Sequence, residues 1–504
     1  MMAAPAQDFT LSHLLAALGG APAELPAIAV SGLALDSRRV RPGDVFLALA
    51  GRRSHGMEYA DAAIAAGAAA VLWETDEAAP AAAGLAWRQA PDGRRVPLVP
   101  VAGLSARAGL LADHFYGRPS ADLFVAGVTG TNGKTTVTQL VSAAMGEGAC
   151  GVVGTLGHGL PPALEASGHT TPDPVTLHRW LAQMREAGAR AVAMEVSSHA
   201  LDQDRTAGVR FDCAVLTNLT HDHLDYHGDM AAYQAAKGRL FRVPGLRYAV
   251  VNTDDPFGRR LLCMLPPGVE PVTYGLSTEA ALPTLYGHGL QADETGLRLE
   301  VDTAWGTGTL ASPLLGRFNA ANLLAALGVL LLAGLSLAEA LERLGRVRGV
   351  PGRMECFGGG DRPLVVVDYA HTPDALHNVL AALRHHCRGR LWCVFGCGGE
   401  RDRAKRPRMG AIAERLADHV VITDDNPRGE DPVSIIEEIQ SGMADPDAAY
   451  VERDRARAIA RAVAGARPGD VVLVAGKGHE DYQLVGGERR PFSDTAQVEK
   501  ALGA

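Results

Sequence analysis

A glycine-rich stretch with a single lysine, Gly127 to Thr136 (GVTGTNGKTT), carries the clearest chemistry in this sequence. An apolar run precedes it and a helical pattern, VTQLVSAAM, follows it. Backbone N–H groups of such a loop bind phosphate at the positive end of a helix. Val128 occupies the position of the first Walker glycine, so the strict pattern fails, yet the strand–loop–helix order still predicts a nucleoside triphosphate such as ATP. The predicted contacts are Gly130, Thr131, Asn132, Gly133, Lys134, Thr135 and Thr136.

Carboxylates and imidazoles follow this loop. A bound triphosphate needs a divalent metal to bridge its oxygens. Glu195 and the stretch TNLTHDHLDYHG, from Thr217 to Gly228, offer ligands. A carboxylate, one histidine and the loop threonine suit Mg²⁺ or Mn²⁺. A zinc site on an HxH pair in a strand, or a solvated polar loop, remain alternatives for this stretch.

Eight apolar runs must position these groups. They alternate with helical patterns, which predicts parallel α/β sheets with both faces covered. Each run ends in polar, acidic, histidine or glycine residues, and ligands of such sheets bind at the carboxyl ends of the strands. The runs cover 122–130, 189–198, 213–220, 248–255, 364–371, 391–399, 419–427 and 470–478.

Length and composition limit the possible classes. The chain has 504 residues, of which 47% are apolar and 21% charged, so we expect about three globular domains. Proline-bearing junctions place them at 1–101, 102–347 and 348–504. The net charge of −9 and only 5% aromatic residues argue against a nucleic-acid partner. Seven cysteines without paired spacing indicate reduced thiols, which fits the cytoplasm. The longest apolar run, Leu323 to Ala338, is too short to span a membrane, so we expect a buried helix and no membrane insertion.

Ten motifs occur in an order that resembles the ATP-dependent Mur ligases of peptidoglycan synthesis. They extend over nearly the whole chain and include GTNGKTT, EVSSHAL, DHLDYHG, YQAAKGRLF, GRFNAAN, PGRME, DYAHTPDAL, GCGGERDRAKRPRMG, DNPR and AGKGHEDYQ. The resemblance implies an α/β fold with three domains: a smaller N-terminal α/β domain for the UDP-sugar, a central P-loop domain with a doubly wound, mostly parallel sheet, and a Rossmann-like C-terminal domain for the amino acid. It also implies a monomer that uses ATP and Mg²⁺.

The resemblance implies a role for particular residues. Thr135, Glu195 and His223 resemble magnesium contacts. Lys237 matches a lysine that the family carries as a carbamate, whose negative charge would make it a further metal ligand that holds a second Mg²⁺, although a helical surface lysine is the plain alternative. Lys134, Lys237, Glu195 and His223 thereby become the catalytic candidates. Asn319, Asn322 and Arg353 resemble ATP-side contacts, and Asp368, Tyr369 and His371 match a strand end that meets the nucleotide. Leu35, Ser37, Thr170, Thr171, Ser197, Gln203 and Arg205 match positions for the UDP-sugar peptide, with Arg52 and Arg53 suited to its diphosphate.

The C-terminal motifs indicate which amino acid is added. DNPR resembles the signature of the branch that joins meso-diaminopimelate to UDP-MurNAc-L-Ala-D-Glu. The expected contacts are Arg401, Asp425, Asn426, Pro427, Arg428, Gly476 and Glu480. Meso-diaminopimelate differs from lysine by a distal carboxylate, and arginine binds carboxylates in a bidentate manner. A lysine-adding ligase, a folylpolyglutamate synthetase-like relative and a P-loop NTPase switch are the alternatives.

Overall fold

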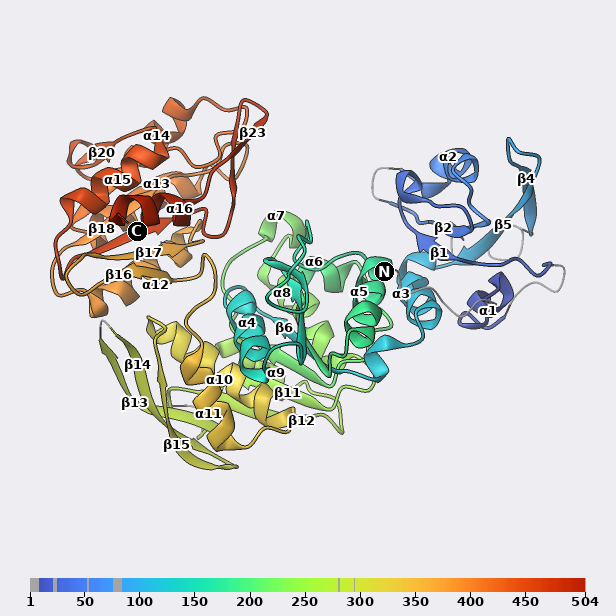
Figure 1. Ribbon diagram of the computed structural model, residues 1–504, viewed down its shortest axis with the longest axis horizontal. Coiled ribbons are helices and arrows are strands. Elements are labelled where there is room, and N and C mark those ends of the chain that lie inside the picture. Colours follow the sequence, from blue (N-terminus) through green and yellow to red (C-terminus); the bar gives the residue numbers. More distant parts are fainter. Residues whose placement is uncertain are drawn as a thin grey trace. The chain divides into compact units, whose positions relative to one another are not determined.

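The computed structural model describes residues 9–20, 25–51, 54–75, 84–279, 282–293 and 295–503. The chain forms two compact units, residues 1–272 and 273–504. Figure 1 labels their elements. No helix within the described ranges is both long and apolar enough to cross a membrane.

The first unit begins with a five-stranded sheet in the order β1-β2-β3-β5-β4. Its strands are parallel except β4, which is antiparallel to β5. Neighbouring residues of β2 point to opposite faces: Val45 packs in one apolar cluster and Phe46 in another, so both faces are covered. This is the smaller α/β domain that the motifs predict. Its elements are α1 (Leu11–Ala16), β1 (Gly32–Ala34), η1 (Ser37–Arg39), β2 (Asp44–Ala48), η2 (Gly56–Tyr59), α2 (Ala60–Ala65), β3 (Ala70–Thr75), β4 (Ala86–Gln89), β5 (Arg95–Ala102) and α3 (Leu104–Phe115).

Six strands of a ten-stranded sheet also belong to this unit, in the order β11-β10-β6-β9-β7-β8. All of these strands are parallel except β8, and four of them, β6, β9, β10 and β11, confirm four of the predicted apolar runs. Their carboxyl ends share one edge, where polar residues begin. The elements are η3 (Pro119–Ala121), β6 (Phe124–Thr129), α4 (Lys134–Met145), β7 (Cys150–Gly154), β8 (Gly157–Gly159), α5 (Pro174–Glu186), β9 (Ala191–Glu195), α6 (Ser198–Asp202), β10 (Cys213–Leu216), α7 (Leu224–His227), α8 (Met230–Gly238), η4 (Arg239–Arg242), β11 (Tyr248–Asn252) and α9 (Pro256–Leu262).

The second unit contains an antiparallel meander, β13-β14-β15, with the end of β12 parallel to β13. The apolar run 323–338 forms the buried helix that we expected, α10, and then breaks at Gly334 before α11. The elements are β12 (Glu270–Gly275, which crosses the unit boundary), β13 (Leu285–Asp293), β14 (Gly296–Thr303), β15 (Gly306–Ser312), α10 (Arg317–Leu332) and α11 (Leu337–Arg346).

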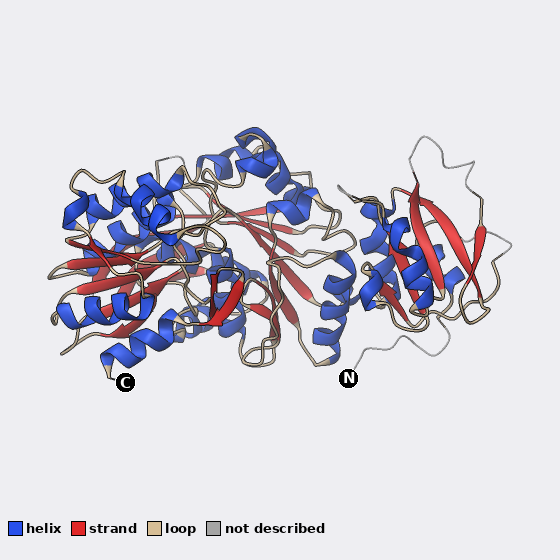
Figure 2. Cartoon of the chain, turned by 90° about the horizontal axis from the view of Figure 1, so that it is seen from above, coloured by secondary structure: helices blue, strands red, loops and turns tan. Residues whose placement is uncertain are grey.

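A six-stranded sheet in the order β16-β17-β21-β18-β19-β20 follows. Its strands are parallel except β16, and the remaining four apolar runs form β17, β18, β19 and β21. Helices cover both faces, as Figure 2 shows, and give the Rossmann-like arrangement expected. The elements are β16 (Glu355–Gly358), β17 (Leu364–Asp368), α12 (Pro373–His386), β18 (Leu391–Phe395), α13 (Lys405–Leu416), β19 (His419–Ile422), α14 (Pro432–Gln440), η5 (Pro446–Ala448), β20 (Tyr450–Val451), α15 (Arg455–Gly465), β21 (Val471–Ala475), β22 (Tyr482–Val485), β23 (Glu488–Pro491) and α16 (Asp494–Leu502).

Candidate active site

The glycine-rich loop connects β6 to α4, in the strand–loop–helix order that its sequence predicts. Gly130 has φ of 151°, and a Cβ atom there would lie 1.8 Å from Oγ1 of Thr217, so the close approach of the neighbouring strand requires glycine. Gly133, with φ of 87°, caps α4. The loop N–H of Asn132 donates to Oδ1 of Asn218 at 3.0 Å. The loop is therefore held from β6 and from the segment after β10.

Two lysine side chains converge on this loop. Nζ of Lys134 donates to the carbonyl oxygens of Gly130 and Thr131, both at 2.9 Å. Nζ of Lys237, on α8, donates to the carbonyl of Gly130 at 2.8 Å. Lys237 is only 1% exposed, so its interpretation as a surface lysine is wrong. Burial, and then the nearby charge of Lys134, hold the pKa of Lys237 well below its usual value.

Thr135 and Glu195 form the second part of the site. Both are buried, and the Thr135 hydroxyl donates to Oε1 of Glu195 at 3.0 Å. The same Oε1 accepts the N–H of Thr155 at 2.7 Å, while the Thr155 hydroxyl donates to Oε2 at 3.2 Å. A hydroxyl and a carboxylate are hard oxygen donors, and their juxtaposition beside a phosphate loop fits Mg²⁺. Sequence reasoning missed Thr155, which lies just beyond β7 and outside the motifs.

His223 lies in a loop before α7 and not in a strand. The HxH pair is not in a strand: His223 precedes α7 with φ of 53°, so the strand-based zinc interpretation is wrong. Its ring lies 4.9 Å from that of His199 and 6.2 Å from that of Tyr233. Burial lowers its pKa, and the charges of Lys134 and Lys237 act in the same direction. Across the described ranges, no group of three or more His, Cys, Asp or Glu side chains is arranged to hold a metal.

The residues predicted for the peptide side form one connected cluster beside Glu195. The Thr171 hydroxyl donates to the Glu195 carbonyl at 2.9 Å and accepts the N–H of Ser197 at 3.1 Å. Arg205 donates to the carbonyl of Thr171 at 3.0 Å and to Oε1 of Gln203 at 2.6 Å. Oγ1 of Thr170 lies 3.0 Å from Oγ1 of Thr155, which links the cluster to the Glu195 carboxylate. The structure thus brings together residues from two predicted stretches of the sequence, 170–171 and 195–205.

A cavity of about 490 Å³ is lined by residues 31–44, by the end of α3 and by residues at the start of and on α5. Leu35 lines it, as do several arginines and the buried Asp44. Ser37 begins the 3-10 helix η1 next to this cavity, and the Asp36 carboxylate caps that helix through the N–H of Arg38. The predicted diphosphate contacts Arg52 and Arg53 lie outside the described residues. The lining residues include Leu35, Asp36, Arg38, Arg41, Asp44, Tyr116, Asp173 and Arg179.

In the second unit, the predicted nucleotide-side residues form two groups. The Arg353 guanidinium lies 4.7 Å from the ring centroid of Tyr369. Oδ2 of the buried Asp368 accepts the N–H of Met354 at 2.8 Å, and burial raises the pKa of Asp368. His371 belongs to the same group, because its Nδ1 lies 2.8 Å from the carbonyl oxygen of Tyr369. On α10, Nδ2 of the buried Asn322 donates to Oδ1 of the buried Asn319 at 2.9 Å.

Two arginines lie close to Gly398, just beyond the end of β18. A Cβ atom on Gly398 would lie 2.9 Å from Nη1 of Arg428 and 3.8 Å from Cγ of Arg401. Nη1 of Arg428 donates to the carbonyl of Gly399 at 2.6 Å. The DNPR loop therefore places Arg428 beside the loop that carries Arg401.

The other predicted residues of this pocket are tied together by a lysine that sequence reasoning missed. Lys477 is fully buried, and its Nζ contacts Oδ1 of Asn426 at 3.1 Å and Oε2 of Glu480 at 2.9 Å. Nδ2 of Asn426 donates to the same Oε2 at 2.9 Å. A Cβ atom on Gly476, with φ of 117°, would lie 2.5 Å from Oδ2 of Asp425. Lys477 lies inside the AGKGHE motif, and this position was the sequence signal that could have identified it as a residue of the pocket.

Comparisons with known proteins agree with this architecture. Three family models match: Mur ligase family, catalytic domain, over residues 29–116; Mur ligase middle domain over 128–330; and Mur ligase, glutamate ligase domain, over 352–478. A protein of Ectopseudomonas mendocina named UDP-N-acetylmuramoyl-L-alanyl-D-glutamate–2,6-diaminopimelate ligase is 52% identical over 96% of this chain and 97% of its own. A protein of Pseudomonas aeruginosa with the same name is 53% identical over 94% of this chain and 95% of its own.

A solved structure of a ligase with that name has a TM-score of 0.70 and 34% identity, and covers 98% of this chain and 99% of its own. The MurF ligase from Thermotoga maritima, solved in complex with ADP, shares the fold at a TM-score of 0.61 and 19% identity, over 95% of this chain and 98% of its own. The sequence identity over nearly the full length, together with the three matching domains, shows that this chain belongs to the Mur ligase family.

Proposed function

We propose that this enzyme joins meso-diaminopimelate to UDP-MurNAc-L-Ala-D-Glu through an acyl phosphate, with the conversion of ATP to ADP and phosphate. The observation that carries the choice of amino acid is the approach of two arginine side chains to one point: a Cβ atom on Gly398 would lie 2.9 Å from Nη1 of Arg428 and 3.8 Å from Cγ of Arg401. Two guanidinium groups suit the distal carboxylate of meso-diaminopimelate, whereas the distal ammonium of lysine would be repelled. The names of the relatives at about 52% identity support the same choice.

The first chemical step activates a carboxylate. The γ-carboxylate of the D-glutamyl residue attacks the γ-phosphorus of ATP, the bond to the β–γ bridging oxygen breaks, and ADP leaves. The loop N–H groups and Lys134 hold the phosphates, and Lys134 exchanges the carbonyls of Gly130 and Thr131 for phosphate oxygens. Mg²⁺, for which Thr135, Glu195 and His223 are the proposed ligands, supplies charge neutralisation when bound.

The second step forms the amide. The amine of meso-diaminopimelate attacks the acyl carbon, a tetrahedral intermediate forms, and phosphate departs with the former carboxylate oxygen. Arg401, Arg428, Asn426 and Glu480 hold the distal end of the amino acid, so that the reacting amine is oriented toward the acyl phosphate. The Thr171–Arg205 cluster holds the peptide end of the nucleotide-sugar. ATP is a cytoplasmic nucleotide, which supports the cytoplasm as the place of the reaction.

One experiment tests the reaction and the amino acid together. The enzyme is incubated with ATP, Mg²⁺ and UDP-MurNAc-L-Ala-D-Glu, and with meso-diaminopimelate or L-lysine in parallel, and the product is weighed by mass spectrometry. We expect the tripeptide mass only with meso-diaminopimelate. A lysine product of equal yield would favour the lysine-adding alternative. Phosphate release without any amine would favour the NTPase switch.

A further inference from the structure

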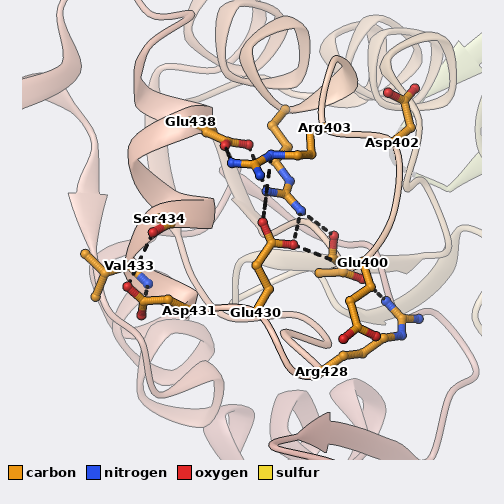
Figure 3. A network of polar contacts seen from close by, with 12 residues as sticks. Glu400, Asp402, Arg403, Arg428, Glu430, Asp431, Val433, Ser434 and Glu438 are labelled. Atoms are coloured by element: carbon orange, nitrogen blue, oxygen red, sulfur yellow. Dashed lines mark hydrogen bonds and ion pairs between the residues drawn. The ribbon is translucent and has the colours of Figure 1, made fainter.

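A buried arginine outside the proposed pocket holds two loops of that pocket together. Arg406, at the start of α13, has a fully buried side chain. Its guanidinium binds Glu430 in a bidentate manner, Nη1 to Oε1 at 2.7 Å and Nη2 to Oε2 at 2.8 Å. Figure 3 labels Glu430 and Glu438 in this network. Nη1 also donates to Oε2 of Glu438 at 2.8 Å, and Nη2 donates to the carbonyl of Gly398 at 3.2 Å. One side chain thus joins α14, the DNPR loop and the end of β18.

Glu430 extends this connection to the backbone on either side of it. Its Oε2 accepts the N–H of Glu400 at 2.9 Å, and its own N–H donates to the carbonyl of Pro427 at 3.1 Å. The N–H of Gly399 donates to the carbonyl of Asn426 at 2.9 Å. The segment just before Arg401 and the segment that contains Arg428 are therefore joined at several points, and the Arg406–Glu430 ion pair adds a buried link between them.

The backbone of both loops needs such support. Glu400 has φ of 54° and Arg428 has φ of 55°, and neither is a glycine. Residues other than glycine rarely adopt this left-handed conformation, and they persist there only where the surroundings determine the backbone. The Glu400 N–H, bonded to Glu430, and the Arg428 N–H, bonded to the Leu484 carbonyl at 2.9 Å, are the anchors of these two strained positions.

We propose that Arg406 and Glu430 are positioning residues for the amino-acid pocket: their ion pair sets the spacing of Arg401 and Arg428, and thereby the affinity for a distal carboxylate. This proposal rests on the proposed function, because it assigns the two arginines to meso-diaminopimelate. Neither Arg406 nor Glu430 touches the substrate in this scheme. They act through the Gly398 carbonyl and the Glu400 N–H.

Glu438 provides a matched control within the same network. It also binds Nη1 of Arg406, and its remaining side-chain contact is with Arg403, whose side chain is 64% exposed. Among the residues that the structure describes, the Glu438 carboxylate contacts Arg403 and Arg406 and, unlike that of Glu430, not the backbone of the Arg401 or Arg428 loop. Glu430→Gln and Glu438→Gln therefore remove the same charge from the same arginine, and only the first disturbs the loops.

The test measures steady-state kinetics of the full-length enzyme and both variants, with meso-diaminopimelate varied and then with ATP varied. For Glu430→Gln we expect KM for meso-diaminopimelate to rise about tenfold, with kcat and KM for ATP within about twofold of the wild-type values. Glu438→Gln should change each constant by no more than about twofold. Arg406→Lys, which cannot span Glu430 and the Gly398 carbonyl together, serves as the second variant and should behave like Glu430→Gln.

The outcomes separate this proposal from a role in stability alone. If Glu430→Gln melts at a lower temperature but keeps the wild-type KM for meso-diaminopimelate, or if KM for ATP rises in parallel, the positioning role is wrong. Equal effects of Glu430→Gln and Glu438→Gln would also overturn it. Failure of the proposed function has a different signature, because the wild-type enzyme would then form no tripeptide with meso-diaminopimelate in the first place.

Discussion

The side-chain amines of Lys134 and Lys237 donate to one carbonyl oxygen, that of Gly130, at 2.9 and 2.8 Å. Two amines that converge on a single neutral acceptor repel each other if both are charged, and Lys237 is buried. A carboxylate or phosphate close to them would relieve that repulsion. ATP provides such a group for Lys134, and conversion of Lys237 to a carbamate would turn its own charge from positive to negative.

We therefore expect Lys237→Arg and Lys237→Ala to lose turnover by at least about a hundredfold, because neither side chain can form a carbamate. Both variants should still bind ATP, since Lys134 and the loop N–H groups remain. Turnover by coupled ADP detection and ATP affinity by calorimetry measure the two effects.

A direct measurement of the modification complements the kinetics. In ¹³C-enriched bicarbonate the wild-type enzyme should show a carbamate carbonyl resonance that is absent from Lys237→Arg. Wild-type activity in Lys237→Arg, or the same resonance in both proteins, would contradict the assignment to Lys237.

The contact between Thr135 and Glu195 leads to a prediction about magnesium. Glu195→Gln keeps the shape of the side chain but removes the negative charge that fits a divalent cation. We expect turnover to fall about a hundredfold and the Mg²⁺ concentration for half-maximal rate to rise. Thr135→Ser, which retains the hydroxyl, should remain close to wild type. A Mg²⁺ dependence unchanged in Glu195→Gln would remove Glu195 from the metal site.

The sequence was sufficient for eight of the strands, because these depend on local patterns. Each of the eight apolar runs contains a strand, since a strand covered on both faces must be apolar along its length. The backbone of His223 was not predictable, because a positive φ outside glycine depends on surrounding contacts. The burial of Lys237 had a faint signal: it stands four residues after the buried Tyr233 on the same face of α8.

The role of Arg406 was invisible in the sequence for a different reason. Its partners Glu430 and Glu438 lie 24 and 32 residues further along the chain. Four arginines stand within 401–408, and no local pattern separates the one that folds inward from the exposed ones. Long-range pairing decides such a position, and it becomes apparent only once α13 and α14 are packed together.

Arg428 provides a direct test of amino-acid selection. Arg428→Ala removes a guanidinium that flanks Gly398, so we expect kcat/KM for meso-diaminopimelate to fall about a hundredfold while KM for ATP stays within about twofold. Arg428→Lys keeps the charge but not the planar fork, and should recover only part of the loss. Product mass at limiting meso-diaminopimelate checks the result. Wild-type incorporation by Arg428→Ala would show that another residue binds the distal carboxylate.

The buried His178 and the partly buried Asp113 lead to a prediction about pH and stability. Oδ1 of Asp113, on α3, lies 3.5 Å from Nδ1 of His178, on α5. Burial raises the pKa of Asp113 from 3.8 to about 6 and lowers the pKa of His178 from 6.5 to about 4. Between pH 3.8 and about 6 the folded Asp113 carboxyl keeps a proton that the unfolded chain has released. The contribution of this proton to stability is therefore lost as the pH rises toward 6. His178 acts oppositely, because its unfolded form binds a proton as the pH falls below 6.5.

Asp113→Asn removes the effect of the Asp113 carboxyl and leaves that of His178. The variant should therefore melt at a higher temperature than wild type above pH 6, by about 2 °C, and the difference should shrink toward pH 4. Thermal melts at intervals between pH 4.5 and pH 8 measure this. Asp61→Asn, which changes a carboxylate in an exposed ion pair with Arg88, is the control and should differ little from wild type at any pH. A lower melting temperature of Asp113→Asn above pH 6 would mean that the ionised Asp113 stabilises the fold through His178.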